Sequence, residues 1–237
     1  MNAATLNSVR ESVDQSGFAI VSSFAPHQVV DELSREIAEL IASNGHLSPH
    51  GIRNLASVSR GTRQLASSSA VLDLVGRVLA RPATLVRSIL FDKVPGANWN
   101  VAWHQDLTIA VEQRIDVEGF GPWTTKDGVV SVQPPVPVLE SMITLRLHLD
   151  DCGPDNGPVR VIPGSHRFGR LSSSHIDELV ASETVAECVA ESGDVLLMRP
   201  LLLHASSKSA SPSHRRVVHL DFADYELPAG LAWSRVA

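Results

Sequence analysis

"SMITLRLHLDD", residues 141–151, is the stretch that decides the fold class. Successive residues of a β-strand point to opposite faces, so the alternation of apolar and polar side chains predicts a strand with two different faces. The apolar face is Ile143, Leu145, Leu147 and Leu149, and the polar face is Thr144, Arg146, His148 and Asp150. We expect one face to pack on a core and the other to meet solvent or a polar cavity.

Other segments after Pro82 resemble this strand in length and composition. Each is short, rich in β-branched or aromatic residues, and bounded by Gly, Pro, Asn or Asp. They cover residues 83–94, 99–107, 157–165, 193–200 and 215–224. Many short strands without intervening helices indicate an antiparallel sandwich or barrel rather than a parallel sheet.

The first third of the chain is predicted to be mainly helical. In residues 25–45 apolar side chains recur at spacings of three and four, which predicts a helix after a short strand. A second helix is predicted over residues 70–79, with Ser68 or Ser69 as its cap. We therefore expect one domain, in which a helical third, residues 1–82, packs on a β core, residues 83–237.

Residues 107–140 lack sustained periodicity and are rich in Gly and Pro. Long loops inside domains are uncommon and often form lids or binding loops. We predict that this segment covers a pocket. The alternative is a surface excursion with a small hairpin of its own.

The composition argues against several classes of protein. The net charge of −6 argues against a nucleic-acid surface, and no apolar run approaches the ~20 residues of a membrane helix. The N-terminus lacks the basic head and apolar block of a secretory signal, so a cytoplasmic location is expected. Cys152 and Cys188 are predicted to be ordinary thiols. The oligomeric state is not predicted.

His-x-Asp pairs are the main candidates for a metal site. The sequence contains four of them: His104/Asp106, His148/Asp150, His175/Asp177 and His219/Asp221. Only an extended segment turns both side chains of such a pair to one face, and the third pair lies in a predicted helix capped by Ser174. The fourth has no histidine after it and follows two arginines, whose charge opposes a cation.

A site with two histidines and one carboxylate needs a further histidine from a distant strand. His204, which follows the apolar stretch 195–203, is available for this role. It can complete either of the two remaining pairs, so the residues themselves leave both pairs open.

Four motifs in order resemble the phytanoyl-CoA dioxygenase family of iron(II)- and 2-oxoglutarate-dependent oxygenases. They are "WHQDL" (103–107), "LHLDDCGPDNGPVRVIPGSHRFG" (147–169), "SGDVLLMRPLLLHASSKS" (192–209) and "RRVVHLDF" (215–222). The resemblance covers most of residues 83–224. It implies a mainly β fold with flanking helices and a double-stranded β-helix core, the jelly roll of cupins.

The resemblance also implies the ligands of the iron. His104, Asp106 and His204 correspond to the family's metal ligands, and Arg215 corresponds to the arginine that binds the far carboxylate of 2-oxoglutarate. Two imidazoles and one carboxylate hold iron(II) while leaving positions for a 2-oxo acid and dioxygen. A guanidinium offers a planar fork that matches a carboxylate.

Further residues of the expected cavity follow from the same resemblance. Thr144 is a candidate contact of the co-substrate. Lys93 is a candidate contact of the co-substrate or the substrate, with an exposed strand lysine as the alternative.

Arg146 departs from the family, whose members often have tryptophan at this position. It is expected either to bind a carboxylate or phosphate of the substrate or to pair with Asp150 or Glu140. His148, beside it, is expected to contact the substrate or to have a structural role.

The implied activity is hydroxylation of a small or medium-sized metabolite at an unactivated carbon, with release of succinate and CO2. Asp106 favours this outcome because halogenating relatives lack the carboxylate ligand. The substrate is expected to carry an anionic group, and phytanoyl-CoA itself is not inferred. A non-catalytic jelly-roll protein and a metal-dependent hydrolase or isomerase of the cupin type are the alternatives.

Overall fold

The structure is a computed structural model that describes all residues except 46, 49, 95–97, 127, 211–213 and 235–237. Its α-helices are α1 (Ala3–Ser16), α2 (His27–Ser43), α3 (Leu55–Val58), α4 (Arg60–Ala66), α5 (Ser69–Leu79), α6 (Val136–Glu140) and α7 (Ser173–Ser182). Two short 3-10 helices are η1 (Pro154–Asn156) and η2 (Ser165–Phe168). No helix in the described part of the chain is long and apolar enough to cross a membrane.

The strands form three antiparallel sheets. In chain order they are β1 (Phe18–Val21), β2 (Gly51–Arg53), β3 (Thr84–Lys93), β4 (Val101–His104), β5 (Ile109–Val111), β6 (Trp123–Lys126), β7 (Val129–Val132), β8 (Met142–His148), β9 (Val159–Val161), β10 (Ala186–Cys188), β11 (Val195–Met198), β12 (His204–Ser206) and β13 (Arg215–Ala223). The sheet orders are β1-β11-β8-β13-β3-β2, β10-β9-β12-β4 and β5-β7-β6.

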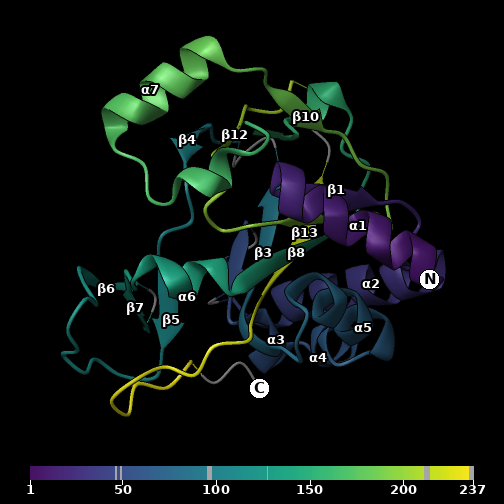
Figure 1. The fold of residues 1–237 in the computed structure, drawn as a ribbon. Helices are drawn as coiled ribbons and strands as arrows, with labels where there is room; N and C mark the ends of the chain where they lie inside the picture. Colours follow the sequence, from purple (N-terminus) through teal and green to yellow (C-terminus); the bar gives the residue numbers. More distant parts are fainter. Residues whose placement is uncertain (46, 49, 95–97, 127, 211–213, 235–237) are drawn as a thin grey trace.

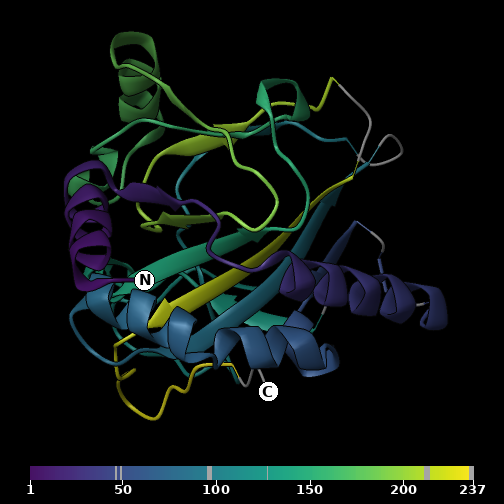
Figure 2. The same ribbon diagram turned by 90° about the vertical axis from the view of Figure 1, so that its right-hand side faces the viewer.

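One face of the six-stranded sheet carries the main hydrophobic core. Leu145 and Leu147 of β8 are fully buried there, together with Leu220 and Phe222 of β13. Helix α2 turns its apolar stripe, Val30, Leu33 and Ile37, into the same cluster. Helices α2 to α5 form a layer against the long strands β3, β8 and β13, while α7 lies at the far end of the molecule (Figures 1 and 2).

The other face of this sheet is polar and is opposed by the four-stranded sheet. Residues of β3, β8 and β13 line one wall of a shared cavity, and residues of β4, β9 and β12 line the other. The two faces predicted for residues 141–151 are confirmed: Ile143 packs in the apolar cluster, and Arg146 lines the cavity. The site therefore lies between two facing antiparallel sheets.

Several elements differ from the sequence prediction. The cap of α5 is Ser68, whose hydroxyl accepts from the Val71 N–H. Helix α1 was not predicted, because it buries only Val9 and Val13 and its apolar stripe is narrow. Strands β10 and β12 have three residues each, too few for a readable alternation.

The segment 107–140 forms the third sheet and helix α6. Its strands pack around a separate apolar cluster that includes Ile109, Val132 and Leu139, and Val111 bridges to Trp233 near the C-terminus. Among the described residues, none from this segment lines the cavity between the two larger sheets. A covering role for the segment therefore stays a prediction.

Candidate metal centre and its cavity

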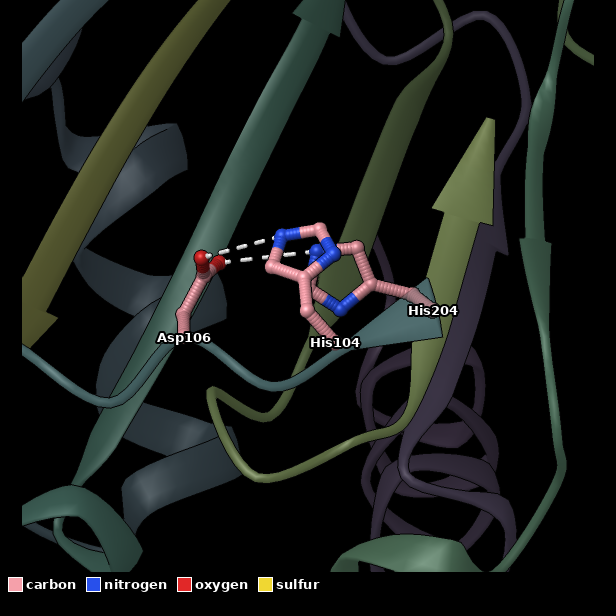
Figure 3. Close-up of side chains that lie close together, drawn as sticks. All are labelled: His104, Asp106 and His204. Atoms are coloured by element: carbon pink, nitrogen blue, oxygen red, sulfur yellow. Dashed lines mark ion pairs between the residues drawn. The ribbon is translucent and has the colours of Figure 1, made fainter. Parts of the chain in front are cut away.

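Two histidines and an aspartate lie together in the lining of the cavity. His104 ends β4 and His204 begins β12, and the two are directly opposite each other in the pairing of these strands. Asp106 follows β4, and its backbone N–H donates to the Pro200 carbonyl over 2.9 Å. One ligand atom from each of the three side chains lies within 4.8 Å of the others (Figure 3).

Both imidazoles are oriented by the backbone. Nδ1 of His104 lies 2.9 Å from the Ala102 carbonyl, and Nδ1 of His204 lies 2.9 Å from the Leu202 carbonyl. Because a carbonyl only accepts, each Nδ1 carries a hydrogen, which leaves Nε2 as the ring atom that can bind a metal ion. Both Nε2 atoms lie 3.7 Å from the Asp106 carboxylate, on the side where a metal ion would bind.

The charge states suit a divalent cation. Burial lowers the pKa of His204 to about 4, so this imidazole is neutral near pH 7. Burial acts to raise the pKa of Asp106, but His204, His219 and His104 outweigh it and hold this pKa below its usual value. Neutral imidazoles with an ionised carboxylate are the donor set of a two-histidine, one-carboxylate metal centre, so these residues fit iron(II).

Gln105, between His104 and Asp106, is hydrogen-bonded to the loops on either side of it. Its amide nitrogen donates to the carbonyls of Gly169 and Leu201, each over 2.7 Å, and its oxygen accepts from the Leu171 N–H over 2.8 Å. The buried amide therefore ties the segment to two neighbouring loops.

Within the described residues, the rival pair at 148 and 150 does not form a comparable cluster. Asp150 accepts from Nε and Nη2 of Arg216 over 2.9 and 2.6 Å, and from the Arg216 backbone N–H over 2.8 Å. His148 is buried, and neither of its ring nitrogens has a hydrogen-bond partner among the described residues. Burial, reinforced by Arg146 and Arg215, lowers its pKa to about 3.

The pair at 175 and 177 lies at the start of α7, as predicted. The cap is Ser172, however, rather than Ser174, and its hydroxyl accepts from the His175 N–H. The helix starts two residues earlier than expected, because three serines in a row give the same capping signal.

The pair at 219 and 221 connects to the cavity in a way that the sequence reasoning missed. His219 lines the cavity, and its Nδ1 lies 3.1 Å from Nη1 of Arg146. On its other side Nε2 lies 3.0 Å from Asp221, which also accepts from Thr144 over 2.6 Å. One feature of the sequence indicates that His219 faces the cavity: it lies four residues after Arg215 and therefore on the same face of β13.

Arg215 and Lys93 lie directly opposite each other on β13 and β3. Arg215 is only 4% exposed and lines the cavity; its Nη1 donates to the Gly157 carbonyl, while its buried Nε has no partner among the described residues. Burial lowers the pKa of this guanidinium from its ordinary value.

Lys93 is 1% exposed, so the alternative of an exposed strand lysine is wrong. Its Nζ donates to the Ser206 hydroxyl over 3.0 Å and to the Ser207 carbonyl over 2.7 Å. Burial, and then the charge of Arg215, lower its pKa to about 8. Ser206 itself lines the cavity.

The remaining candidates lie on the inner face of β8. Arg146 lines the cavity and contacts His219, and among the described residues it has no ion pair with Asp150 or Glu140. Thr144 is buried, and its hydroxyl donates to Asp221; it is not among the residues that line the cavity. The cavity has a volume of about 180 Å³, and Phe91 and Trp99 supply apolar wall.

Comparison with known proteins agrees with this architecture. The family model of phytanoyl-CoA dioxygenase (PhyH) matches residues 13–217. An ectoine dioxygenase of Nocardia farcinica is 24% identical over 90% of this chain and 76% of its own length. Phytanoyl-CoA dioxygenase 1 of Oryza sativa subsp. japonica is 28% identical over 65% of this chain, which spans 48% of that relative.

A solved relative has the same fold. The epimerase SnoN, in complex with Fe3+, alpha ketoglutarate and nogalamycin RO, superposes with a TM-score of 0.73 at 15% identity, over 100% of this chain and 88% of that one. The expected jelly-roll class with flanking helices is thereby confirmed, and this relative holds the iron and the 2-oxo acid that the resemblance implied. With the match over residues 13–217, these findings show that the chain belongs to the phytanoyl-CoA dioxygenase (PhyH) family of iron- and 2-oxoglutarate-dependent oxygenases.

Proposed function

We propose that this protein binds iron(II) through His104, Asp106 and His204 and uses 2-oxoglutarate and dioxygen to oxidise a small molecule. The observation that carries the proposal is the convergence of two Nε2 atoms and one carboxylate, all within 4.8 Å, at a cavity whose opposite wall carries cations. Bound iron(II) supplies the oxygen-dependent decarboxylation of 2-oxoglutarate that is coupled to oxidation of the substrate.

Arg215 is proposed to bind the far carboxylate of 2-oxoglutarate. Its guanidinium is buried, lines the cavity, and has no carboxylate partner among the described residues, so a ligand carboxylate would complete its hydrogen bonding. The Gly157 carbonyl holds Nη1, and the buried Nε, which has no partner among the described residues, is proposed to bind the ligand.

Lys93 is proposed to support the same carboxylate. An ammonium has three N–H donors, and two of those of Lys93 are used by Ser206 and Ser207, so one remains. Ser206 extends this contact into the cavity. The single O–H of Thr144 donates to Asp221. Any contact of Thr144 with the co-substrate is therefore proposed to be a van der Waals contact rather than a hydrogen bond donated by the hydroxyl.

Hydroxylation of a small or medium-sized metabolite at an unactivated carbon, with release of succinate and CO2, is the proposed outcome. The name of the ectoine dioxygenase relative supports an oxygenase acting on a small molecule. The chain is proposed to act as one domain in which the segment 107–140, attached directly to Asp106, moves over the cavity when substrate binds.

Conversion of 2-oxoglutarate to succinate under air, with added iron(II) and no substrate, tests the proposal. We expect slow succinate formation by the wild type and none by His204→Ala. An anaerobic absorption band should form only when iron(II) and 2-oxoglutarate are both present. Absence of both signals in folded wild-type protein would favour the non-catalytic or hydrolytic alternatives instead.

A further inference from the structure

We propose that Arg146 is the specificity-determining residue for the substrate and that it binds an anionic group, a carboxylate or a phosphate, of that substrate. This inference rests on the proposed function and adds a substrate class to it. It depends on three observations: the unused donors of Arg146, the way His219 holds it, and the charge of the cavity.

Arg146 is a buried cation whose donors are only partly used. Its side chain lies in the residue set that lines the cavity, and the residue is 8% exposed. Nη1 contacts His219, but the buried Nε has no hydrogen-bond partner, and no carboxylate among the described residues forms an ion pair with it. A buried charge without a partner is costly, so a ligand that supplies the missing anion would be bound favourably.

Arg216 shows, in the same molecule, what the unused edge of Arg146 can bind. Arg216 holds Asp150 through Nε and Nη2, over 2.9 and 2.6 Å, in a two-pronged contact with one carboxylate. The same Nε–Nη2 edge of Arg146 makes no hydrogen bond within the described part of the chain, and the guanidinium faces the cavity. The planar fork is therefore free for a carboxylate or two phosphate oxygens.

His219 holds Arg146 without neutralising it. A guanidinium only donates, so Nδ1 of His219 must be the acceptor of the 3.1 Å contact, and Nε2 carries the hydrogen that faces Asp221 over 3.0 Å. Asp221 is fixed in turn by the Thr144 hydroxyl and by Arg87, at 2.6 and 3.5 Å. The ring of Phe91 lies 5.6 Å below the guanidinium, so the group is held on two sides and open toward the cavity.

The charges of the cavity leave room for a further anion. Among the described residues, Arg146 and Arg215 are the cations that line it, and buried Lys93 lies behind Ser206. Against them Asp106 is the one described carboxylate that lines the cavity, and Asp221 is paired with Arg87. A divalent metal adds two positive charges, and 2-oxoglutarate adds only two negative ones. Two positive charges therefore stay uncompensated when metal and co-substrate are both bound, and a substrate anion would balance one or both of them.

Arg146 and Arg215 have separate places in the fold. Arg146 is opposite His219 in the register of β8 and β13, and His219 is four residues from Arg215 on one strand face. At about 3.3 Å per residue, the backbone positions of the two arginines are separated by roughly 13 Å along the strand direction. One anion can therefore be held by each.

Calorimetric titration of small anions into the anaerobic protein, loaded with Mn(II) and 2-oxoglutarate, tests the inference. We expect acetate or inorganic phosphate, but not neutral acetamide, to bind saturably to the wild type. In Arg146→Met this binding should weaken about 10–100-fold, the loss of one charge-assisted fork. Arg146→Lys should lie between the two. Arg216→Met is the matched control, since Arg216 lies on the face of β13 away from the cavity, where it pairs with Asp150, and this variant should bind the anions as the wild type does.

Three outcomes would overturn the inference: no anion binding by the wild type, equal binding by Arg146→Met, or loss of 2-oxoglutarate binding in Arg146→Met, which would make Arg146 the co-substrate anchor. Failure of the proposed function would give a different result, because the complex with Mn(II) and 2-oxoglutarate would then not form. The same anion titrations on the unloaded protein would still compare Arg146→Met with Arg216→Met. A succinate-release screen that pairs each acid with its primary amide extends the test to substrates, with the acids alone expected to stimulate turnover.

Discussion

His104 and His204 lie directly opposite each other on β4 and β12, with ring centroids 4.1 Å apart, and each points Nδ1 at the carbonyl two residues before it. The same local arrangement thus occurs twice, once on each strand of the pair. Strand pairing therefore sets the distance between the two imidazoles. Asp106, the third proposed ligand, lies in the segment that follows β4.

Asp106→Ala is expected to lose metal binding, whereas Asp150→Ala keeps it. Removing a ligand should weaken iron(II) affinity by more than about 100-fold, the upper range for loss of an outer partner alone. Asp150→Ala breaks the fork to Arg216 and should lower the free energy of unfolding by about 1–3 kcal/mol. Anaerobic metal titration and urea denaturation measure the two effects. Metal loss in the Asp150 variant instead would assign the site to the other pair.

Arg215→Lys is expected to weaken 2-oxoglutarate binding while leaving the metal in place. Lysine keeps the charge but not the planar fork, and a charge-assisted fork corresponds to about 10–100-fold in affinity. The change should appear in the dissociation constant of 2-oxoglutarate, measured by anaerobic titration of the iron-loaded protein. Unaltered 2-oxoglutarate affinity in both Arg215→Lys and Arg215→Met would rule out this residue as the anchor.

Gly157→Ala tests how Arg215 is held in position. Gly157 has φ +61°, and an added Cβ would collide with the Ser207 carbonyl, while its own carbonyl accepts from Arg215. We expect a loss of about 1–3 kcal/mol in the free energy of unfolding, together with weaker 2-oxoglutarate binding. Gly153→Ala is the control, because a Cβ there meets nothing within 4 Å. If the two variants had the same free energy of unfolding and the same 2-oxoglutarate affinity, Gly157 would not be needed to hold Arg215 in position.

The alternation in residues 141–151 was sufficient to predict both faces of β8, because a strand with different environments on its two sides leaves a period-two pattern. The strand is more completely buried than the alternation alone indicates, since every residue from Met142 to His148 is buried. The polar face was predicted to meet solvent or a cavity, and the cavity is what it meets.

Pairing partners were harder to predict than positions. The sequence shows that Arg146 and His219 lie on strand faces, but only the register of β8 with β13 makes them neighbours. The pairing of Asp150 with Arg216 depends on the same register. Sequence spacing carries no information on which strands are adjacent, and this is why the role of His219 was missed.

His148 makes stability depend on pH in a definite direction. Its pKa is lowered to about 3 in the folded protein, against about 6.5 in the unfolded chain. Between these two pH values the imidazole is protonated in the unfolded chain and neutral in the folded protein. The free energy of unfolding must therefore fall as the pH falls from about 6.5, by up to about 1.4 kcal/mol per pH unit for this one group. His204, with its pKa at about 4, adds to this dependence in the metal-free protein.

Replacing His148 by leucine should reduce the slope of the free energy of unfolding against pH, by up to the equivalent of one proton, between pH 6.5 and 4.5. At pH 7.5 the variant should be at least as stable as the wild type, because neither ring nitrogen has a hydrogen bond to lose among the described residues. Urea denaturation in EDTA at several pH values measures both quantities, and an unchanged slope in the variant would show that His148 is protonated or solvated in the folded protein.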